Sequence, residues 1–576
     1  MSTSGGRLWT RLDGECGRGA GSRFTSAAAA ARRWTFVRWR RAGLSQLRSA
    51  DDTTHMSANA PAVTIPADTR SRARAARAGE WLQRRALFVV AICAVAVLCA
   101  AGIPAHLAQD GWLSLLAGRL VAAHGIPHQD LFTQMAHGAQ WTDQQWLSQL
   151  LMYGLYALGG LQLLTVSAVL VIGGSFGAAV FAARRLGAQD LHVLAVLPVG
   201  AFFYLSTAVS IRTQELAYPL FMAVIYLLAS DARSVQPLRR TWLVLPLLVL
   251  WSNLHGSVTM GVGLVTVHCF ALALREFRKH GVTGALLNLR RRGSRSRQAL
   301  GLALSAPLTL LATPYGGGMI HYYSVTLGNS EFGKLVSEWK PTSATPVLAV
   351  PLFLLIAAVG YALARSNRRT PLFDHLVLAM LALGAIIAVR NITWFGLAVV
   401  ALLPPSISHA RGDRPAPLRN ARVNRVLALA MLALTVLAFG TVLAQPSGWF
   451  TSTYPAGALS TLDRLVARNP SVRIFADVRY ADWLIWRQPQ VFSGRVAYDT
   501  SLELLSDSQL RQIALLTANH QRGFPKLLRG YGIWVLNPAN KLGDRRLLRL
   551  PGVRPVLRSK RVIIAAYGAT RGGARG

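Results

Sequence analysis

The sequence predicts an all-α polytopic membrane protein, with about eleven membrane-spanning helices and a small α/β domain at its C-terminal end. Hydrophobic residues make up 52% of the 576 residues and charged residues only 15%, whereas soluble domains carry about a quarter charged residues. The apolar residues also gather in runs of about 18 to 22, the length that a helix needs to cross the hydrocarbon core of a bilayer. A soluble core could not bury this much apolar surface, but a bilayer can.

The basic residues support the same class of protein. The formal net charge is +38, which in a soluble protein would suggest a nucleic-acid partner. Here the basic residues form short clusters between the apolar runs, as in loops that face an anionic membrane leaflet. We therefore expect a membrane and no nucleic acid as partner. Three of the four cysteines, Cys93, Cys99 and Cys269, lie in apolar segments, so we expect no disulfide framework.

The first 85 residues are rich in Arg, Ala, Ser and Gly and show little apolar periodicity. This composition predicts a disordered basic tail, which we place in the cytoplasm. Met56 would serve equally well as the start of translation, in which case residues 1–55 do not belong to the protein. A targeting sequence is the alternative, but the tail lacks a short apolar core followed by a small-residue cleavage site.

Residues 86–445 form the predicted transmembrane region. Its apolar runs, in chain order, cover residues 86–101, 161–183, 191–210, 214–230, 242–255, 258–274, 299–313, 347–364, 376–389, 392–407 and 426–444. If the N-terminus is cytoplasmic, the cytoplasmic side receives every strong basic cluster of the loops, at 184–185, 233–240, 275–297, 365–369 and 411–425. The odd number of spans then places the C-terminal domain outside the cytoplasm.

The first outside loop, residues 102–160, is too long and too patterned to be a plain connector. Residues 108–124 and 147–158 predict two amphipathic helices that lie along the membrane surface. Asp110 and Asp143 each open one of these helices, and N-capping would account for either residue alone. Two carboxylates in one loop, beside Trp112 and Trp146, could instead accept a proton from a hydroxyl or hold a divalent metal against a phosphate.

Further polar residues lie at the ends of spans on the same predicted side, namely Arg212, His255, Glu338 and Arg390. Snorkelling or helix capping is the alternative explanation for each of them. Arg212 and Arg390 differ from the rest because they are lone cations on the side where cations are scarce, and an arginine there can bind a phosphate bidentately. For His255, the roles of base, phosphate donor and satisfied turn residue all stay open.

Several short motifs in the chain occur together in one known family. They are Asp110-Gly111-Trp112, Gly118-Arg119, Gly125-Ile126-Pro127, Asp130, Trp141, Trp146-Leu147, Asn253-Leu254-His255-Gly256, Pro314-Tyr315-Gly316, Glu338-Trp339 and Tyr454-Pro455. From residue 86 to about residue 545, the chain resembles a large bacterial family of glycosyltransferase-like proteins of the GT-C superfamily. The motifs are weak singly and fairly specific as a set.

The resemblance implies an enzyme of the bacterial inner membrane that takes a sugar from a polyprenyl-phosphate carrier. Such enzymes pass the sugar to an acceptor outside the cytoplasm, and their first outside loop carries an essential aspartate, which Asp110 matches. Two positions depart from the family. Ala108 and Gln145 stand where the family often has Asp and Glu, respectively, which weakens the case for a divalent metal and leaves a degenerate member possible as an alternative.

Residues 446–576 have the character of a small α/β domain. Residues 473–476, 490–492, 532–536 and 561–566 predict strands, and residues 459–468, 506–519 and 525–530 predict helices. The segment contains neither a Gly-rich phosphate loop nor a metal-ligand spacing. The aromatic stretch 480–486 suits packing under the sheet better than stacking on a sugar. Asp477, Asp482 and Asp499 are candidate polar residues at the rim of the domain.

These observations favour a membrane glycosyltransferase that uses a lipid-linked sugar donor. Asp110 would be the base or the orienting carboxylate, with Asp143 as its helper. Arg212 and Arg390, with His255, would hold the carrier phosphate, and Glu338, Trp112 and Trp146 are further candidates for contacts with the substrate. Ala108 and Gln145 favour a non-catalytic scaffold of the same fold instead. A lipid or sugar transporter is a third alternative, but it predicts mid-span ionisable residues and matched broken helices, which the sequence does not clearly show.

Overall fold

The computed structural model describes residues 67–102, 107, 109–208, 210–291, 293–329, 331, 335–366, 370–411, 421–517, 526–539 and 547–568. The chain divides into two compact units, Met1–Glu80 and Trp81–Gly576. Residues 67–84, which we predicted to be disordered, form helix α3 (Ala67–Arg84), because alanine and arginine have high helix propensity. Met56, the rest of the predicted tail and Ala108 lie outside the described residues.

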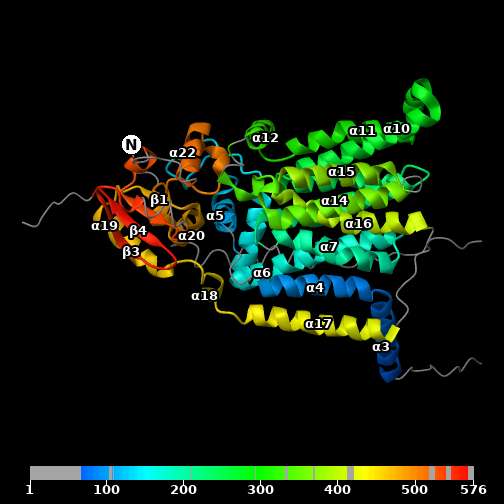
Figure 1. The fold of residues 1–576 in the computed structure, drawn as a ribbon, viewed down its shortest axis with the longest axis horizontal. Helices are drawn as coiled ribbons and strands as arrows, with labels where there is room; N and C mark the ends of the chain where they lie inside the picture. The colour runs from blue at the N-terminus through cyan, green and yellow to red at the C-terminus, as the bar shows by residue number, and fades with distance from the viewer. Residues whose placement is uncertain are drawn as a thin grey trace, which may run out of the picture. The chain divides into compact units, whose positions relative to one another are not determined.

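The predicted apolar runs all fall on helices, which lie alongside one another in Figure 1. The helices are α4 (Ala86–Gly102), α6 (Trp146–Arg185), α7 (Asp190–Ala208), α8 (Tyr218–Arg233), α9 (Val244–Leu254), α10 (Val258–Arg290), α11 (Arg295–Leu308), α14 (Pro346–Ser366), α15 (Leu372–Ile387), α16 (Ile392–Arg411) and α17 (Ala421–Leu443). In the described part of the chain, six helices are long and apolar enough to cross a membrane. The number rises to seven if the bent pair Ala76–Arg84 and Ala86–Gly102 counts as one span.

The structure therefore confirms a multi-helix membrane fold but not the count of about eleven spans. Helix α9 has 11 residues, which gives a length of about 17 Å, far less than the roughly 30 Å of a hydrocarbon core. Helix α15 has 16 residues and is also short. Apolar content alone could not distinguish these short helices from complete spans.

Helix α6 joins two segments that we predicted as separate, a surface helix at 147–158 and a span at 161–183. The break between them is at Gly159 and Gly160, whose backbone leaves the helical region. Gly160 has a φ of 64°, in the left-handed region that glycine adopts without steric cost. The first half keeps Leu151 and Leu158 exposed, as expected for a helix on a membrane surface.

Helix α5 (Gln109–His124) forms where we predicted the first amphipathic helix. Its apolar face does not lie on a membrane, because it is covered by α6 on one side and by α20 (Val478–Arg487) on the other. Trp112, Leu115 and Leu116 are buried. An apolar stripe predicts burial, but it does not tell whether protein or lipid covers it.

The C-terminal domain contains a four-stranded sheet in the order β1-β2-β4-β3. Its strands are β1 (Ile474–Ala476), β2 (Ile533–Leu536), β3 (Val553–Arg558) and β4 (Ile563–Tyr567). Strands β1 and β2 pair in parallel, with Ile474 opposite Ile533, and the other two pairings are antiparallel. The domain's helices include α19 (Leu459–Arg468), α20 and α22 (Asp507–Thr517), and the sheet lies at the opposite end of Figure 1 from α10 and α11.

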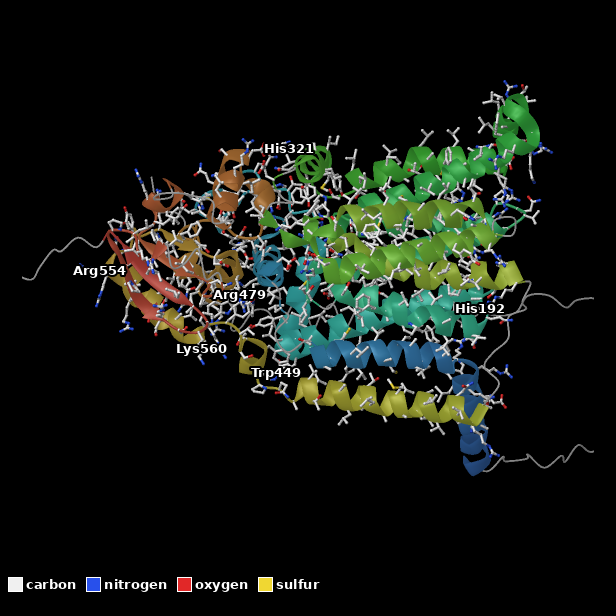
Figure 2. All side chains as sticks on the ribbon, in the orientation of Figure 1. His192, His321, Trp449, Arg479, Arg554 and Lys560 are labelled. Carbon is white, nitrogen blue, oxygen red and sulfur yellow. The ribbon has the colours of Figure 1, made fainter. Side chains whose placement is uncertain are left out.

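The structure confirms three of the four predicted strands, as β1, β2 and β4. The prediction at 490–492 was wrong, since these residues belong to the short helix α21 (Pro489–Phe492), where Pro489 suits the first helical turn. Strand β3 was missed because it is a largely exposed edge strand with Pro555 in it, and it therefore lacks an apolar pattern. Arg554 of this strand lies on the outer edge of the domain (Figure 2).

The first outside loop and the C-terminal domain pack as one body. Backbone N–H groups of Gln134 and Met135 donate to the carbonyls of Val496 and Ala497 at 2.7 and 2.9 Å. Arg119 of α5 lies over the Trp486 ring of α20, at 4.9 Å from its centroid. The aromatic stretch of α20 is buried, so packing, the role that we favoured for it, is confirmed.

Candidate functional site

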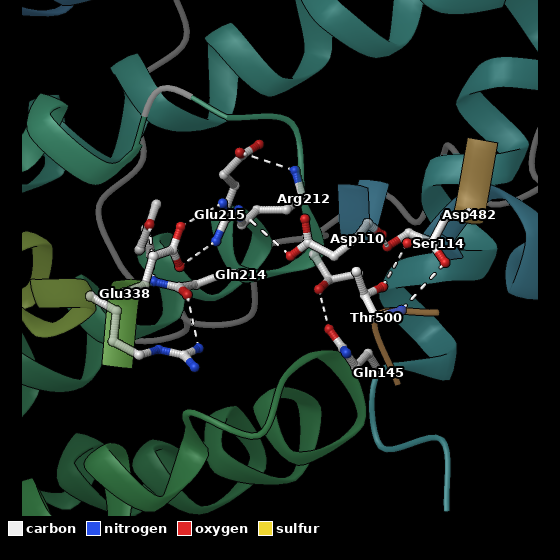
Figure 3. A network of polar contacts seen from close by, with 12 residues as sticks. Asp110, Ser114, Gln145, Arg212, Gln214, Glu215, Glu338, Asp482 and Thr500 are labelled. Atoms are coloured by element: carbon white, nitrogen blue, oxygen red, sulfur yellow. Dashed lines mark hydrogen bonds and ion pairs between the residues drawn. The ribbon is translucent and has the colours of Figure 1, made fainter. Parts of the chain in front are cut away.

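Arg212 is the centre of a polar network at the end of the helical bundle (Figure 3). Its two terminal nitrogens donate to the two carboxylate oxygens of Glu338 at 2.7 and 2.8 Å. Its Nε lies 3.7 Å from Oδ2 of Asp110, and its backbone N–H donates to Oε1 of Glu215 at 3.1 Å. One guanidinium therefore connects the first outside loop, the turn before α8 and the segment that carries Glu338.

Asp110 reaches Arg212 because a glycine follows it. Asp110 lies in the first turn of α5, and its side chain is 41% exposed. A Cβ at Gly111 would come within 2.6 Å of the carbonyl oxygen of Ile211, the residue before Arg212. Only a residue without a side chain lets the start of α5 approach this backbone so closely. The partner of the Asp110 carboxylate is thus a distant arginine, which agrees with a role beyond helix capping.

Glu338 and its neighbour Trp339 hold two arginines close together. Glu338 occupies the fork of Arg212, while the guanidinium of Arg390 lies over the Trp339 ring, at 4.7 Å from its centroid. Nη2 of Arg390 also donates to Oε1 of Gln214 at 3.3 Å. Burial alone would raise the pKa of Glu338, but Arg212 and Arg390 lower it, so this carboxyl group stays ionised.

His255 caps the C-terminal end of α9 and is buried. Its Nδ1 accepts a hydrogen bond from the backbone N–H of Ser257 at 3.0 Å and lies 2.9 Å from the Ser257 hydroxyl. Burial, together with the charges of Arg390 and Arg212, lowers the pKa of His255 to about 3. The ring is therefore neutral, with its proton on Nε2, and this arrangement favours a hydrogen-bond donor over a base.

Among the described contacts of Asp143, none is with Asp110 or Arg212. Asp143 is buried before α6, and its Oδ1 accepts from Nε2 of Gln149 at 2.8 Å. Among the described residues, its Oδ2 has no hydrogen-bond partner. Burial, with a smaller contribution from Glu503, raises the pKa of Asp143 to about 7. The two aspartates of the first outside loop therefore have different surroundings.

The two tryptophans also have separate places. Trp112, which we predicted beside the two carboxylates as a candidate substrate-binding residue, is only 1% exposed and packs edge-on against Tyr454, at 5.5 Å between ring centroids. The indole N–H of Trp146 donates to Oδ1 of Asn253 at 3.0 Å. Asn253 belongs to the turn that carries His255, so Trp146 helps to hold that turn.

Three residues of the network carried no clear signal in the sequence, namely Thr213, Gln214 and Glu215. Their positions directly after Arg212 were the only indication. Gln145, which we noted only as a departure from the family, accepts a hydrogen bond from the Thr213 hydroxyl. The position that is often Glu in the family therefore lies against this network, and here it is neutral.

The carboxylates of the C-terminal domain are not at its rim, contrary to our prediction for Asp482 and Asp499. Both are buried, and Thr500 donates to Asp482 through its hydroxyl at 2.9 Å. Asp477 caps α20 by accepting from the backbone N–H of Arg479 at 2.9 Å. Asp482 nevertheless lies near the network in Figure 3.

The arrangement does not fit a divalent metal. Asp110 and Glu338 both face Arg212, whose guanidinium already occupies the Glu338 carboxylate, and Gln145 brings no further carboxylate. Within the described ranges, no group of three or more His, Cys, Asp or Glu residues could hold a metal ion. We therefore derive no step through a metal.

No family model and no curated protein matches the chain. Among solved structures, the chain is similar to ArnT from Cupriavidus metallidurans bound to undecaprenyl phosphate, with 16% identity, a TM-score of 0.44, and coverage of 85% of this chain and 99% of that one. It is also similar to the oligosaccharyltransferase of Archaeoglobus fulgidus in its apo form, with 12% identity, a TM-score of 0.42, and coverage of 78% and 69%. At this identity and TM-score, the similarities carry no argument about the family or the reaction of this chain.

Proposed function

We propose that this protein is a membrane glycosyltransferase that moves a sugar from a polyprenyl-phosphate carrier to an acceptor hydroxyl on the extracytoplasmic face. One observation carries the proposal. The half-exposed carboxylate of Asp110 lies at the end of the helical bundle beside Arg212, and one turn, through Glu338 and Trp339, holds Arg212 and Arg390 together. A carboxylate beside two guanidiniums provides a proton acceptor and an anion site in one place.

In the proposed reaction, the acceptor hydroxyl attacks the anomeric carbon of the sugar. The new bond forms between the acceptor oxygen and this carbon, and the bond from the carbon to the phosphate oxygen breaks. The proton of the hydroxyl passes to the carboxylate of Asp110. The electron pair of the broken bond stays on the leaving phosphate, where Arg390 and the Nε2–H of His255 stabilise the developing charge.

We assign different roles to the two arginines. The fork of Arg212 is already filled by Glu338, so Arg212 orients Asp110, and Glu338 positions Arg212. Arg390 makes a single 3.3 Å hydrogen bond to Gln214 and stacks on Trp339, which leaves donors for a phosphate. His255 supplements Arg390 as a neutral donor through its Nε2–H, since its Nδ1 already accepts a hydrogen bond from the backbone of Ser257.

One observation favours the non-catalytic alternative. The carboxylates of the network are already paired with Arg212, and Gln145 is neutral where the family often has a glutamate. A scaffold of this fold would bind a partner or a lipid carrier without turning it over.

The test uses full-length protein in lipid nanodiscs, with a panel of polyprenyl-phosphate sugars as donors and a cell-envelope extract as acceptor. We expect wild type to release polyprenyl phosphate and Asp110→Asn to do so about 100-fold more slowly or not at all. Asp507→Asn is the matched control, because Asp507 is also a first-turn aspartate, of α22, but is exposed and far from the network.

Two outcomes would count against the proposal. Equal turnover by wild type and Asp110→Asn would remove Asp110 from the reaction. Binding of polyprenyl phosphate without turnover of any donor, by folded wild-type protein, would favour the scaffold.

A further inference from the structure

A second site lies at the other end of the bundle from the network. We infer that the cavity between α10 and the start of α15 binds the phosphate headgroup of an anionic phospholipid. The cavity adjoins the N-terminal end of α15, while Arg390 follows its C-terminal end. The 16 residues of α15 separate the two places by about 24 Å. The inference is therefore independent of the proposed function.

The cavity has a volume of about 360 Å³, which suits a headgroup and the first carbons of its chains. Part of its wall is apolar and includes Ala271, Leu272, Leu372 and Phe373. The rest is basic and consists of Arg275, Arg278 and Lys279 of α10. A lining that changes from apolar to cationic matches the change from acyl chain to phosphate in an anionic lipid.

The three cations lie on one face of α10, because residues three and four apart are neighbours on a helix. None of them forms an ion pair with another described residue. The acids nearby already have partners of their own: Asp374 pairs with Arg233, and Asp231 lies 3.5 Å from Arg295. Glu276 of α10 accepts a hydrogen bond from Asn288 at 3.4 Å and lies 3.9 Å from His280. Three like charges side by side repel one another, and a bound anion would relieve this repulsion.

His268 provides an independent indication of a ligand. Its side chain is fully buried and lines the cavity. Its Nε2 lies 3.1 Å from the Asp231 carboxylate, while its Nδ1 has no hydrogen-bond partner among the described residues. A buried polar atom without a partner is unfavourable, so an oxygen of a bound headgroup would supply the missing contact.

The position of the cavity favours a lipid over a soluble anion. Helix α10 breaks at Gly281, so its first part, residues 258–280, is about 34 Å long, and the three cations in its last turns therefore lie close to one end of a hydrocarbon core of roughly 30 Å. Phe270 and Phe277 of α10 are exposed at 58% and 49%, as lipid-facing residues would be. Basic pockets between spanning helices are suited to anionic headgroups. Figure 2 shows His192 of α7 at this same end of the bundle, away from the C-terminal domain.

The test measures lipid binding to full-length protein in a neutral detergent, by thermal unfolding during titration with dioleoylphosphatidylglycerol, dioleoylphosphatidylcholine or inorganic phosphate. We expect phosphatidylglycerol alone to raise the unfolding temperature. The double variant Arg275→Gln/Arg278→Gln should bind it about 30-fold more weakly, since each cation near a membrane surface contributes about fivefold. Arg422→Gln/Arg425→Gln is the matched control, because it removes two exposed arginines with the same spacing from α17.

A second variant tests the buried side of the cavity and leaves the three cations in place. His268→Gln keeps an amide nitrogen where Nε2 meets Asp231 but removes Nδ1, and we expect it to weaken phosphatidylglycerol binding several-fold. If Arg422→Gln/Arg425→Gln lost as much affinity for phosphatidylglycerol as Arg275→Gln/Arg278→Gln, the lipid would be attracted by positive charge in general, and the proposed site would be overturned. A shift by inorganic phosphate equal to that by phosphatidylglycerol would overturn the lipid assignment, and wild-type binding by His268→Gln would overturn the proposed contact.

Discussion

At the scale of single residues, the candidate site depends on one guanidinium that is shared between two carboxylates. Arg212 is bidentate to Glu338 and also faces Asp110. Burial would lower the pKa of Arg212, but Asp110 and Glu338 raise it above its ordinary value, so the charge persists. Glu338 therefore controls the orientation of Arg212, and through it the orientation of Asp110.

Glu338→Gln tests this chain of contacts. We expect kcat for release of the carrier phosphate to fall about 10- to 100-fold, because a small displacement of Asp110 lowers the rate of proton transfer. We expect no rise in KM for the donor. Steady-state kinetics in nanodiscs measure both constants. Glu331→Gln is the control, since Glu331 also faces an arginine, with 3.6 Å to Arg511, but takes no part in the network. A raised KM with unchanged kcat would instead mean that Glu338 contacts the donor itself.

The sequence indicated four members of the network. Asp110 is a carboxylate that opens a helix of the first outside loop, and Arg212, Glu338 and Arg390 are charged residues at the predicted outside ends of spans. It could not show that Arg212 and Glu338 pair, since residues far apart in the chain carry no mark of their contact. Gln145 and Gln214 are neutral side chains, and nothing in their local pattern distinguishes them from ordinary loop residues.

At the scale of elements, the site depends on how closely α5 approaches α6. A Cβ at Gly118 of α5 would lie 2.1 Å from the carbonyl oxygen of Gln149 and 2.8 Å from the Cβ of Tyr153. Backbone atoms cannot move aside as a flexible side chain can. Gly118 therefore sets the distance between α5, which carries Asp110, and α6, which begins shortly after Asp143.

Gly118→Ala should separate the two helices. We expect a loss of about 1–3 kcal/mol in the free energy of unfolding from overpacking, together with a loss of turnover. Gly154→Ala in α6 is the control, because no atom lies within 4 Å of its added Cβ, and alanine favours a helix more than glycine does. Thermal unfolding and turnover of both variants check the prediction, and it fails if the two behave alike.

Elements with a strong apolar pattern were predictable, including the long spans and strands β1, β2 and β4. Elements with a weak pattern were not. Strand β3 is exposed on most of its length, and the break in α6 depends on two glycines that also suit a loop. The sequence predicted that α5 has an apolar face. It could not show that the C-terminal domain covers this face, because that domain lies several hundred residues later in the chain.

At the scale of the whole molecule, buried carboxyl groups collect where the first outside loop meets the C-terminal domain. Burial, and then the charge of Asp130, raises the pKa of Asp499 to about 8. Burial is also the main cause that raises the pKa of Glu503 to about 7. Neighbouring Asp482 has a raised pKa as well, from burial and from Asp499. These groups stay protonated in the folded protein at pH values where the unfolded chain would have lost their protons.

This difference predicts a pH-dependent stability. Between pH 6.5 and about 8 the folded state binds more protons than the unfolded state, so the free energy of unfolding should fall as the pH rises. Below pH 6.5, His255 acts in the opposite direction because its pKa is lowered, so the higher window isolates the carboxyl groups.

Thermal unfolding of the full chain from pH 6.5 to 8.5 measures this slope. Asp499→Asn should flatten it and raise the unfolding temperature at pH 8, whereas exposed Asp507→Asn should leave it unchanged. An unfolding temperature that rises with pH in this window would contradict the prediction.

The backbone pairing of residues 134–135 with residues 496–497 also has a consequence for biosynthesis. The ribosome makes the first outside loop early, but the segment that pairs with it emerges only after the whole helical bundle. At a synthesis rate of about 5 to 20 residues per second, the backbone groups of residues 134 and 135 stay without these partners for tens of seconds. The interface between this loop and the C-terminal domain is therefore completed late in the synthesis of the chain, and a chain that ends before its last domain never forms it.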